Sequence, residues 1–459
     1  MIGKLALPEI RELVEAKDLE TLGDVLNRWL PADLAELFEG LGDDERAFAL
    51  RALQSPLASE AFEYFDLDAQ ERLLVTLNDE ESALLLNGMA PDDRTALLEE
   101  LPHDNAERLI GLLSPAERAV ARSLLLYERD SVGRLMTPDF VAIKAQWTLK
   151  RALDFIRQHG KDSETLNVVY VVDDAGKLID DIRIREFLLA PLHANVRDVM
   201  DRQFVSLRDV DDKEAAVDVF RKYDRTALPV IDAGGRLVGI VTIDDVLDVA
   251  EEQATRALQQ FGGVEALDES YSATSLLSMV RKRATWLIVL FLGEMLTATA
   301  MSYFEDDLKR AVVLALFIPL IISSGGNSGS QAATLIIRAL SLGEVKLRDW
   351  WQVMRREIAS GLLLGLILGV IGFGRIALMS RFSTFYGPYW HLIALTVGLS
   401  LVGIVLLGTI AGSMLPFILK RLGVDPATSS APFVATLVDV TGLILYFSVA
   451  VVVLRGTLL

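Results

Sequence analysis

Five apolar segments, each long enough to cross a membrane as a helix, fill the C-terminal part of this 459-residue chain. A spanning helix needs about 20 predominantly apolar residues. Lipid offers no partners for backbone groups, so such segments are expected to be helical. The predicted spans are residues 284–304, 311–337, 358–378, 391–415 and 432–454.

Charge divides the chain where these segments begin. The net charge is −19, although the mean hydropathy is positive, at +0.35. Residues 281–459 hold 15 basic and 9 acidic side chains, which leaves 30 basic and 55 acidic ones in residues 1–280. A strongly acidic soluble region therefore precedes an apolar membrane region. This acidity argues against a nucleic-acid partner, because phosphate binding needs clustered Lys and Arg.

Residue usage also excludes several kinds of chemistry. The chain has no cysteine and only four scattered histidines, which argues against disulfides, thiolate metal sites and imidazole zinc sites. No nucleophile and base pair or phosphate loop occurs at a useful spacing, so we do not predict an enzyme. Binding of a hard cation by carboxylates remains open.

Basic residues flank the predicted spans unequally. With the N-terminal region inside, the cytosolic flanks hold ten Lys and Arg and the outer flanks five. Cytosolic loops carry the excess of basic residues. The first thirty residues lack the apolar core of a signal peptide. We expect a multi-pass protein of the cell membrane with a cytoplasmic N-terminal region and an external C-terminus.

Residues 1–130 are predicted to form an all-α superhelical domain. A loose repeat appears as LGDDERAFAL, LDAQERLLVTL, APDDRTALLEEL and SPAERAVARSLL, each with an arginine. Arg46, Arg72, Arg94 and Arg118 are spaced as expected for stacked short helices. We interpret their charges as solvated helix faces.

Residues 131–252 repeat an α/β pattern. VGRLMTPDFVAI matches VRDVMDRQFVSL, and VVYVVDDAGKLIDDI matches TALPVIDAGGRLVGIV. Each half predicts strand, turn, strand and helix. The tandem resembles a CBS-domain pair. A helical connector over 253–283, broken at Gly262 and Gly263, leads to a five-helix membrane domain over 284–459, whose third and fourth spans carry glycines suited to close helix packing.

Two carboxylates fall within the predicted spans. An ionisable group at membrane depth is costly and usually marks an ion path or a buried pair. Asp439 lies inside the fifth span, one turn after Ala435, so its side chain and the Ala435 carbonyl can face the same side. Such a set suits a hydrated divalent cation. The alternative is an aspartate hydrogen-bonded to a neighbouring helix. Glu294 is either structural or pore-lining.

The second span contains the polar run PLIISSGGNSGSQ. Pro319 is expected to free a carbonyl, and Gly325, Gly326 and Asn327 to interrupt the helix. Exposed backbone is tolerated at membrane depth where it lines a water-filled path. A simple helix kink is the alternative.

The domain order and two membrane motifs, PLIISSGGNSGSQ and LGVDPATSSAPFVATLVDVTGL, resemble the MgtE family of magnesium channels. The resemblance implies a homodimer with a pore between its subunits, in which Asp439 holds hydrated Mg²⁺ beside the Ala435 carbonyl. It also implies that cytosolic Mg²⁺ closes the pore by binding acidic residues between the soluble and membrane domains.

Carried over by position, the implied gating residues are Asp224, Asp245, Asp248 and Asp425. Helix geometry independently places Asp245, Asp248 and Glu252 on one face. Acids crowded on one arc repel unless cations neutralise them. The alternative is a solvated helix N-terminus whose acids are favoured by the helix dipole.

A CBS pair often holds an adenine nucleotide, and the resemblance points to Thr242 and Asp245 for ATP. The same pair also matches a helix-capping arrangement. Two other functions remain open for the whole chain. One is a secondary divalent-cation carrier coupled to Na⁺ or H⁺ through Glu294, and the other is a membrane-bound nucleotide sensor without transport.

Overall fold

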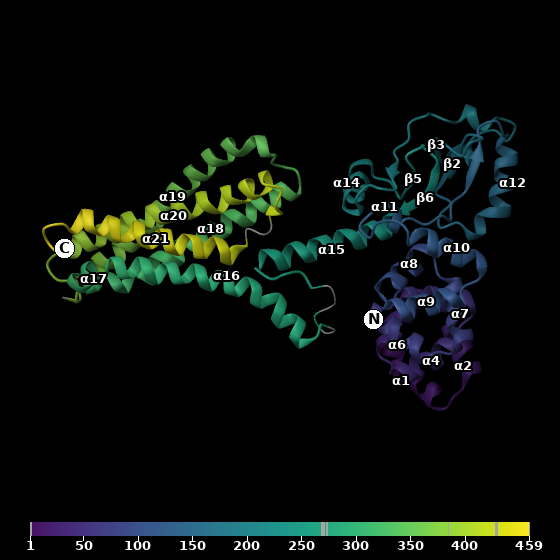
Figure 1. Ribbon diagram of the computed structural model, residues 1–459, viewed down its shortest axis with the longest axis horizontal. Coiled ribbons are helices and arrows are strands. Elements are labelled where there is room, and N and C mark those ends of the chain that lie inside the picture. Colours follow the sequence, from purple (N-terminus) through teal and green to yellow (C-terminus); the bar gives the residue numbers. More distant parts are fainter. Residues whose placement is uncertain (1, 268–270, 272–273, 384, 427–429, 459) are drawn as a thin grey trace. The chain divides into compact units, whose positions relative to one another are not determined.

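The computed structural model describes residues 2–267, 271, 274–383, 385–426 and 430–458. Its residues form two compact units, Met1–Glu252 and Gln253–Leu459. Helices and two small sheets make up the first unit, and long helices make up the second (Figure 1). The predicted class, a multidomain membrane protein with an all-α region, an α/β pair and five spanning helices, is confirmed.

The first unit begins with short helices that pack on one another. Several start at a side-chain cap, such as Asp66 and Asn78, which accept hydrogen bonds from backbone N–H groups of the first turn. Their apolar faces form one continuous core. The helices are α1 Ile2–Glu15, α2 Leu19–Leu26, α3 Pro31–Glu39, α4 Asp43–Arg51, α5 Ser55–Glu63, α6 Leu67–Thr76, α7 Asp79–Gly88, α8 Pro91–Glu100, α9 His103–Leu112 and α10 Pro115–Leu124.

A regular polar contact repeats through these helices. In each case a side chain donates to the backbone carbonyl eight residues earlier, at the end of the preceding helix. The donor and acceptor pairs are Arg46 and Phe38, Gln70 and Phe62, Arg94 and Leu86, and Arg118 and Ile110. The last carbonyls of a helix have no partner within that helix, so these side chains satisfy them.

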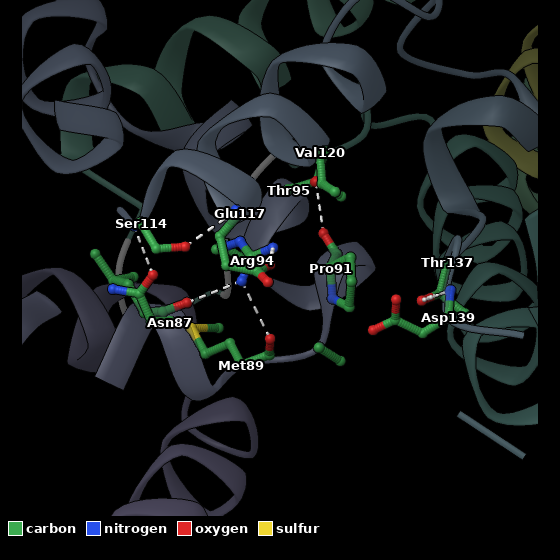
Figure 2. Close-up of polar contacts among 12 residues, drawn as sticks. Asn87, Met89, Pro91, Arg94, Thr95, Ser114, Glu117, Val120, Thr137 and Asp139 are labelled. Atoms are coloured by element: carbon green, nitrogen blue, oxygen red, sulfur yellow. Dashed lines mark hydrogen bonds and ion pairs between the residues drawn. The ribbon is translucent and has the colours of Figure 1, made fainter. Parts of the chain in front are cut away.

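This contact corrects the interpretation of the arginines as solvated faces. Arg46 is 6% exposed and Arg94 is fully buried. Figure 2 shows Arg94 between Met89 and Glu117; it donates to the Met89 carbonyl at 3.3 Å and pairs with Glu117 at 2.5 Å. The buried position of the second repeat is Gln70, whereas Arg72 is exposed and pairs with Asp43 at 3.4 Å. The sequence prediction used arginines alone, and it therefore placed the buried position of the second repeat two residues too late in the chain.

Two similar α/β modules follow, as predicted. In each, the first strand pairs in parallel with the second, and the second pairs antiparallel with the third. Gly176 and Gly235 both have φ +80° in the turn between the antiparallel strands, where a left-handed residue is required. The elements are α11 Val132–Leu135, β1 Ala142–Lys144, α12 Leu149–His159, η1 Gly160–Asp162, β2 Val168–Val172, β3 Leu178–Arg183, α13 Ile184–Leu189, η2 Val196–Asp198, β4 Leu207–Arg208, α14 Lys213–Tyr223, β5 Ala227–Ile231, β6 Leu237–Thr242 and α15 Ile243–Phe261.

The first part of the predicted connector belongs to a helix that starts earlier, at Ile243, and ends just before the predicted glycines. Helix α15 starts directly after β6, so strand β6 fixes the position of the acidic residues in its first turns. The helix ends at Phe261, and Gly263 takes a left-handed φ of +73°. The next helix starts at Leu276, eight residues before the predicted span, because its first two turns extend beyond the apolar run.

Five helices of the second unit are long and apolar enough to cross a membrane. They lie alongside one another in Figure 1. This number agrees with the sequence prediction, although most of the helices extend past the apolar runs. The elements are α16 Leu276–Tyr303, α17 Glu305–Arg310, η3 Val312–Phe317, α18 Ile318–Ser341, η4 Leu347–Asp349, α19 Trp350–Met379, α20 Trp390–Arg421 and α21 Ala431–Leu454.

Glycines bring these helices into backbone contact, as predicted for α19 and α20. A β-carbon added at Gly369 would lie 2.8 Å from the Gly398 carbonyl oxygen. Helix α20 approaches α18 more closely still, since a β-carbon at Gly408 would lie 2.3 Å from the Gly325 carbonyl oxygen. Small residues allow such contact where no hydrophobic effect drives helices together.

Candidate cation-binding sites

Three membrane helices meet around the carboxylate of Asp439. Ala435 and Asp439 are one turn apart on α21 and face α18 at Gly326. A β-carbon at Gly326 would lie 3.4 Å from the Ala435 β-carbon and 3.8 Å from Asp439 Oδ1. Both distances are ordinary van der Waals contacts, so the Asp439 carboxylate and Ala435 lie directly beside α18 at Gly326.

Glu294 on α16 completes this group. Its carboxyl lies within hydrogen-bonding reach of the Asp439 carboxyl. Helix α16 reaches α21 closely here, because a β-carbon at Gly293 would lie 2.6 Å from Thr436 Cγ2. Two carboxyl groups from different helices therefore share one place within the predicted spans. Oxygen groups of this kind are preferred by Mg²⁺ and Ca²⁺.

The predicted interruption of the second span is wrong. Helix α18 runs without a break from Ile318 to Ser341 through Gly325, Gly326 and Asn327. Pro319 lies in its first turn, where the missing N–H costs little. The Ala315 carbonyl, four residues before Pro319, accepts a hydrogen bond from the Ile318 N–H. The glycines serve close packing: Gly325 lies against Val438 and Ile404.

A polar stripe follows the exposed face of α18. Its members recur at helical spacing and lie at the depth of the predicted second span. They are Ser323, Asn327, Gln331 and Thr334. Asn327 donates to Ser323 Oγ at 3.4 Å, and the stripe otherwise faces away from the core of this chain. Polar groups at membrane depth usually face a bundle interior or a water-filled cavity.

Acidic side chains from distant parts of the first unit form a second group. Asp92 and Asp93 lie in the first turn of α8, and Asp244, Asp245 and Asp248 lie in the first turns of α15. The acids at the starts of α8 and α15 lie in the same region, because Asp245 acts electrostatically on both Asp92 and Asp93. We call Glu63, Asp92, Asp93, Glu164, Asp244, Asp245 and Asp248 the acidic cluster.

Burial and mutual repulsion raise the pKa values in the acidic cluster. Burial raises the pKa of Asp93 to about 7, with further increases from Asp245, Glu164 and Asp244. Burial likewise raises the pKa of Asp245 to about 7, against a hydrogen bond from Thr242 that lowers it. The pKa of Glu63 also rises to about 7, mainly through burial. Negative charge in this region is therefore costly without a cation.

The structure brings together only some of the predicted gating residues. Asp245 and Asp248 belong to the acidic cluster. Glu252 instead contacts Lys213 at 3.2 Å, so its charge is met by a basic side chain. Asp224 is exposed at the C-terminal cap of α14, in a left-handed conformation with φ 52°. Asp425 is an exposed residue of the second unit, after α20.

Sequence reasoning missed the cluster members outside α15. Asp92 is 8% exposed and its Oδ1 has no hydrogen-bond partner among the described residues. Asp92 and Asp93 stand in the motif APDDRTALLEEL, where acids at a helix start are ordinary. Glu164 follows a short 3₁₀ helix, and its N–H donates to the Asp139 carbonyl at 2.8 Å. The only signal in the sequence was the pair of consecutive acids, Asp92 and Asp93, directly before Arg94.

Neither group holds a complete cation site within one chain. Among the described residues, no three His, Asp or Glu side chains converge closely enough to bind a metal ion. Near Asp245, Thr242 Oγ1 donates to Asp245 Oδ2 at 2.6 Å, the contact expected of a helix cap. The two residues predicted for nucleotide binding are thus hydrogen-bonded to each other, next to the other acids of the acidic cluster.

Comparisons with known proteins match every part of this architecture. Residues 318–449 match the family model MgtE, a divalent cation transporter, and residues 29–130 match the MgtE intracellular N domain. Residues 132–193 and 196–252 match the CBS domain. The magnesium transporter MgtE of Thermus thermophilus is 38% identical over 99% of this chain and 100% of its own length. The chain belongs to the MgtE family.

Further members and solved structures agree. The magnesium transporter MgtE of Bacillus subtilis is 29% identical to this MgtE protein, over 93% of this chain and 92% of its own length. A crystal structure of the cytosolic domain of the Mg²⁺ channel MgtE in complex with ATP matches 53% of this chain and 99% of that domain, at 34% identity and a TM-score of 0.51. The soluble part of a magnesium transporter matches 55% of this chain and 99% of its own, at 25% identity and a TM-score of 0.53.

Proposed function

We propose that this MgtE protein conducts Mg²⁺ across the membrane along a path that includes Asp439. The observation that carries the proposal is the position of Asp439 Oδ1 beside Gly326 of α18, together with Ala435. One carboxylate with nearby backbone suits an ion that keeps much of its hydration shell. The Glu294 carboxyl adds charge from a second helix. Pro319, Gly325, Gly326 and Asn327 belong to the helix that forms the opposite side.

The protein acts as a homodimer in this proposal. The polar stripe of α18 is exposed in one chain, and α16 has no buried residue among those described. A second copy facing these helices would shield the stripe from lipid and add a second Asp439. Two identical carboxylates related by a twofold axis would hold a cation that one chain cannot.

Transport should depend on the charge of Asp439. Uptake of Mg²⁺ is measured in cells that require external magnesium, with wild type, Asp439→Ala and Asp439→Asn at matched membrane levels. Both variants are expected to lose uptake, while Asp306→Asn, on the loop helix α17, is expected to keep it. Uptake by Asp439→Ala equal to wild type would reject this path.

The coupled-carrier alternative is tested in the same system. Purified protein in liposomes should carry Mg²⁺ current without a Na⁺ or H⁺ gradient if it is a channel. Loss of the current when those gradients are removed, with recovery when they are restored, would favour a carrier. Tight ATP binding without isotopic flux under any gradient would favour the sensor.

The acidic cluster is the proposed sensor of cytosolic Mg²⁺. Asp92 of α8 is buried and Asp245 of α15 is half-buried, and the exposed Asp93 lies near them. These carboxylates repel one another, and a divalent cation between them removes the repulsion. Binding would hold the N-terminal helices against the CBS pair and bias the connector, which continues from α15. Asp224, Glu252 and Asp425 remain proposed as further acids of the gate.

Neutralising two members tests the sensor. In the wild type, millimolar Mg²⁺ should protect the region from limited proteolysis and reduce flux. Asp93→Asn with Asp245→Asn should abolish both effects. The matched control is Asp174→Asn, whose side chain is 90% exposed in a turn of the same unit. Unchanged Mg²⁺ protection in the double variant would refute this assignment.

We also propose that the CBS pair binds ATP. The support is the ATP complex of the related cytosolic domain. Thr242 is 6% exposed, at the junction of β6 and α15. The acids around Asp245 would oppose a triphosphate, so binding is expected to require Mg²⁺. Calorimetry should show binding of Mg-ATP that weakens in Thr242→Val; no binding by the wild type would rule it out.

A further inference from the structure

One face of α19 carries two hollows, one basic and one apolar. Near the start of the helix, Trp351, Gln352, Arg355 and Arg356 line a hollow of about 480 Å³. Val353 lies about 160° around the helix from Trp351 and Arg355 and belongs to a buried cluster with Ile336 and Leu340, so these two lining residues face away from the helix bundle. The arginines of the hollow come directly before the apolar run of the third span.

The side chains at the basic hollow suit the boundary between water and membrane. Trp350 and Trp351 are 48% and 55% exposed, and their rings lie 5.5 Å apart in an edge-on arrangement. Tryptophan is enriched where headgroups meet hydrocarbon. Arg355 is exposed and takes no part in the ion pairs of the described residues, while Arg356 interacts with its neighbour Glu357. Two guanidinium groups at this depth can bind one phosphate.

The apolar hollow lies farther along the same helix face. Leu366, Val370 and Phe373 of α19 and Leu395 and Leu399 of α20 line a groove of about 220 Å³, formed where glycines bring the two helices together. At 100° per residue, the α19 members lie within about 60° of Arg355 around the helix. Leu366 is roughly 16 Å along the axis from Arg355. This distance is close to the thickness of one leaflet, which is half of a hydrocarbon core about 30 Å thick.

We propose that this face of α19 binds an anionic phospholipid. Arg355 and Arg356 hold the headgroup phosphate, Trp351 lies beside the glycerol region, and one acyl chain extends along α19 to the groove at Leu366. A lipid satisfies both hollows at once, whereas a free phosphate occupies only the basic one. The site is separate from Asp439 and does not depend on the proposed ion path or gate.

The test uses the full-length protein in detergent, with dioleoyl phosphatidylglycerol or dioleoyl phosphatidylcholine added and bound lipid counted by native mass spectrometry. The wild type is expected to prefer phosphatidylglycerol. Its affinity should fall about fivefold for each arginine removed in Arg355→Gln and Arg356→Gln, since a basic residue near an anionic lipid surface contributes that much. The lysine variants at both positions should keep most of the preference.

Arg375→Gln with Arg381→Gln is the matched control. Both arginines are exposed: Arg375 lies near the end of α19, and Arg381 lies just after the helix. Their replacement removes the same charge. An equal loss of phosphatidylglycerol in the control pair would overturn the proposal, because the preference would then follow net charge. Displacement of the lipid by soluble glycerol phosphate at equal concentration would overturn it too, since the site would then be one for free phosphate. If the double glutamine variant does not fold, the single variants give the same comparison.

Discussion

Arg94 places a positive charge inside the stacked helices of the first unit. It is fully buried, donates to the carbonyls of Leu86 and Met89, and pairs with Glu117. Arg94→Ala would leave these buried acceptors without donors, at a cost of about 1–3 kcal/mol in stability. Hydrogen exchange of α7–α10 in the full-length protein should show this loss.

The control for Arg94 is Arg72→Ala. The Arg72 side chain is 53% exposed and makes only a surface ion pair, so its removal should change stability by less than about 0.5 kcal/mol. Equal losses in both variants would contradict the role given to the buried donor. The repeat position that matches Arg94 in this helix is Gln70 rather than Arg72.

The carboxylates of the acidic cluster should make the first unit pH-sensitive. Asp93 and Asp245 have pKa values of about 7, above the ordinary value of 3.8. Between these values the folded state binds more protons than the unfolded state, so stability decreases as the pH rises from about 4 to about 7 and then levels off. Hydrogen exchange in α8 and α15, corrected for intrinsic rates, should show weaker protection at pH 8 than at pH 5.5 without divalent cations.

Adding Mg²⁺ and neutralising two carboxylates test this pH effect further. Mg²⁺ at pH 8 should restore protection, and Asp93→Asn with Asp245→Asn should reduce the dependence on pH. Protection that increases with pH in the wild type without cations would contradict the pKa directions.

Helix packing in the membrane unit depends on a few glycine contacts. A β-carbon at Gly412 of α20 would lie 2.0 Å from the Gly329 carbonyl oxygen, whereas one at Gly374 of α19 would meet nothing within 4 Å. Gly412→Ala should therefore destabilise the unit by about 1–3 kcal/mol through overpacking. Gly374→Ala should be neutral or slightly stabilising, as in a helix interior. Thermal unfolding in detergent compares the two, and a similar decrease in both would contradict this account.

At the level of elements, the sequence predicted the features that depend on residues close together in the chain. The apolar runs predicted five spans, and the duplicated motifs predicted two α/β modules, because both depend on nearby residues. The predicted break in α18 was wrong for a physical reason. Gly325 and Gly326 lower helix propensity, but contact with α20 and α21 stabilises a continuous helix, and propensity alone could not show those neighbours.

At the scale of the whole chain, both candidate sites join residues that are far apart in sequence. Asp439 meets Glu294 from another helix, and Asp245 of α15 meets Asp93 of α8. Sequence pattern identified Asp439, Glu294 and Asp245 individually, because a carboxylate in a span or on an acidic helix face stands out. It could not pair Asp245 with Asp93, because that approach depends on how the helical stack packs against the CBS pair.

The orientation of the whole chain can be tested through its lack of cysteine. The excess of basic residues on the N-terminal side of five spans predicts that residues after α21 lie outside the cell and that the loop between α18 and α19 lies inside. Thr457→Cys and Glu344→Cys each introduce a single thiol into a chain that has none, at positions outside the helices. In intact cells, a membrane-impermeant maleimide should label the Thr457 variant and spare the Glu344 variant. After the membrane is opened, both should react, which controls for accessibility. The reverse pattern in intact cells would place the acidic cluster outside, where it could not sense cytosolic Mg²⁺.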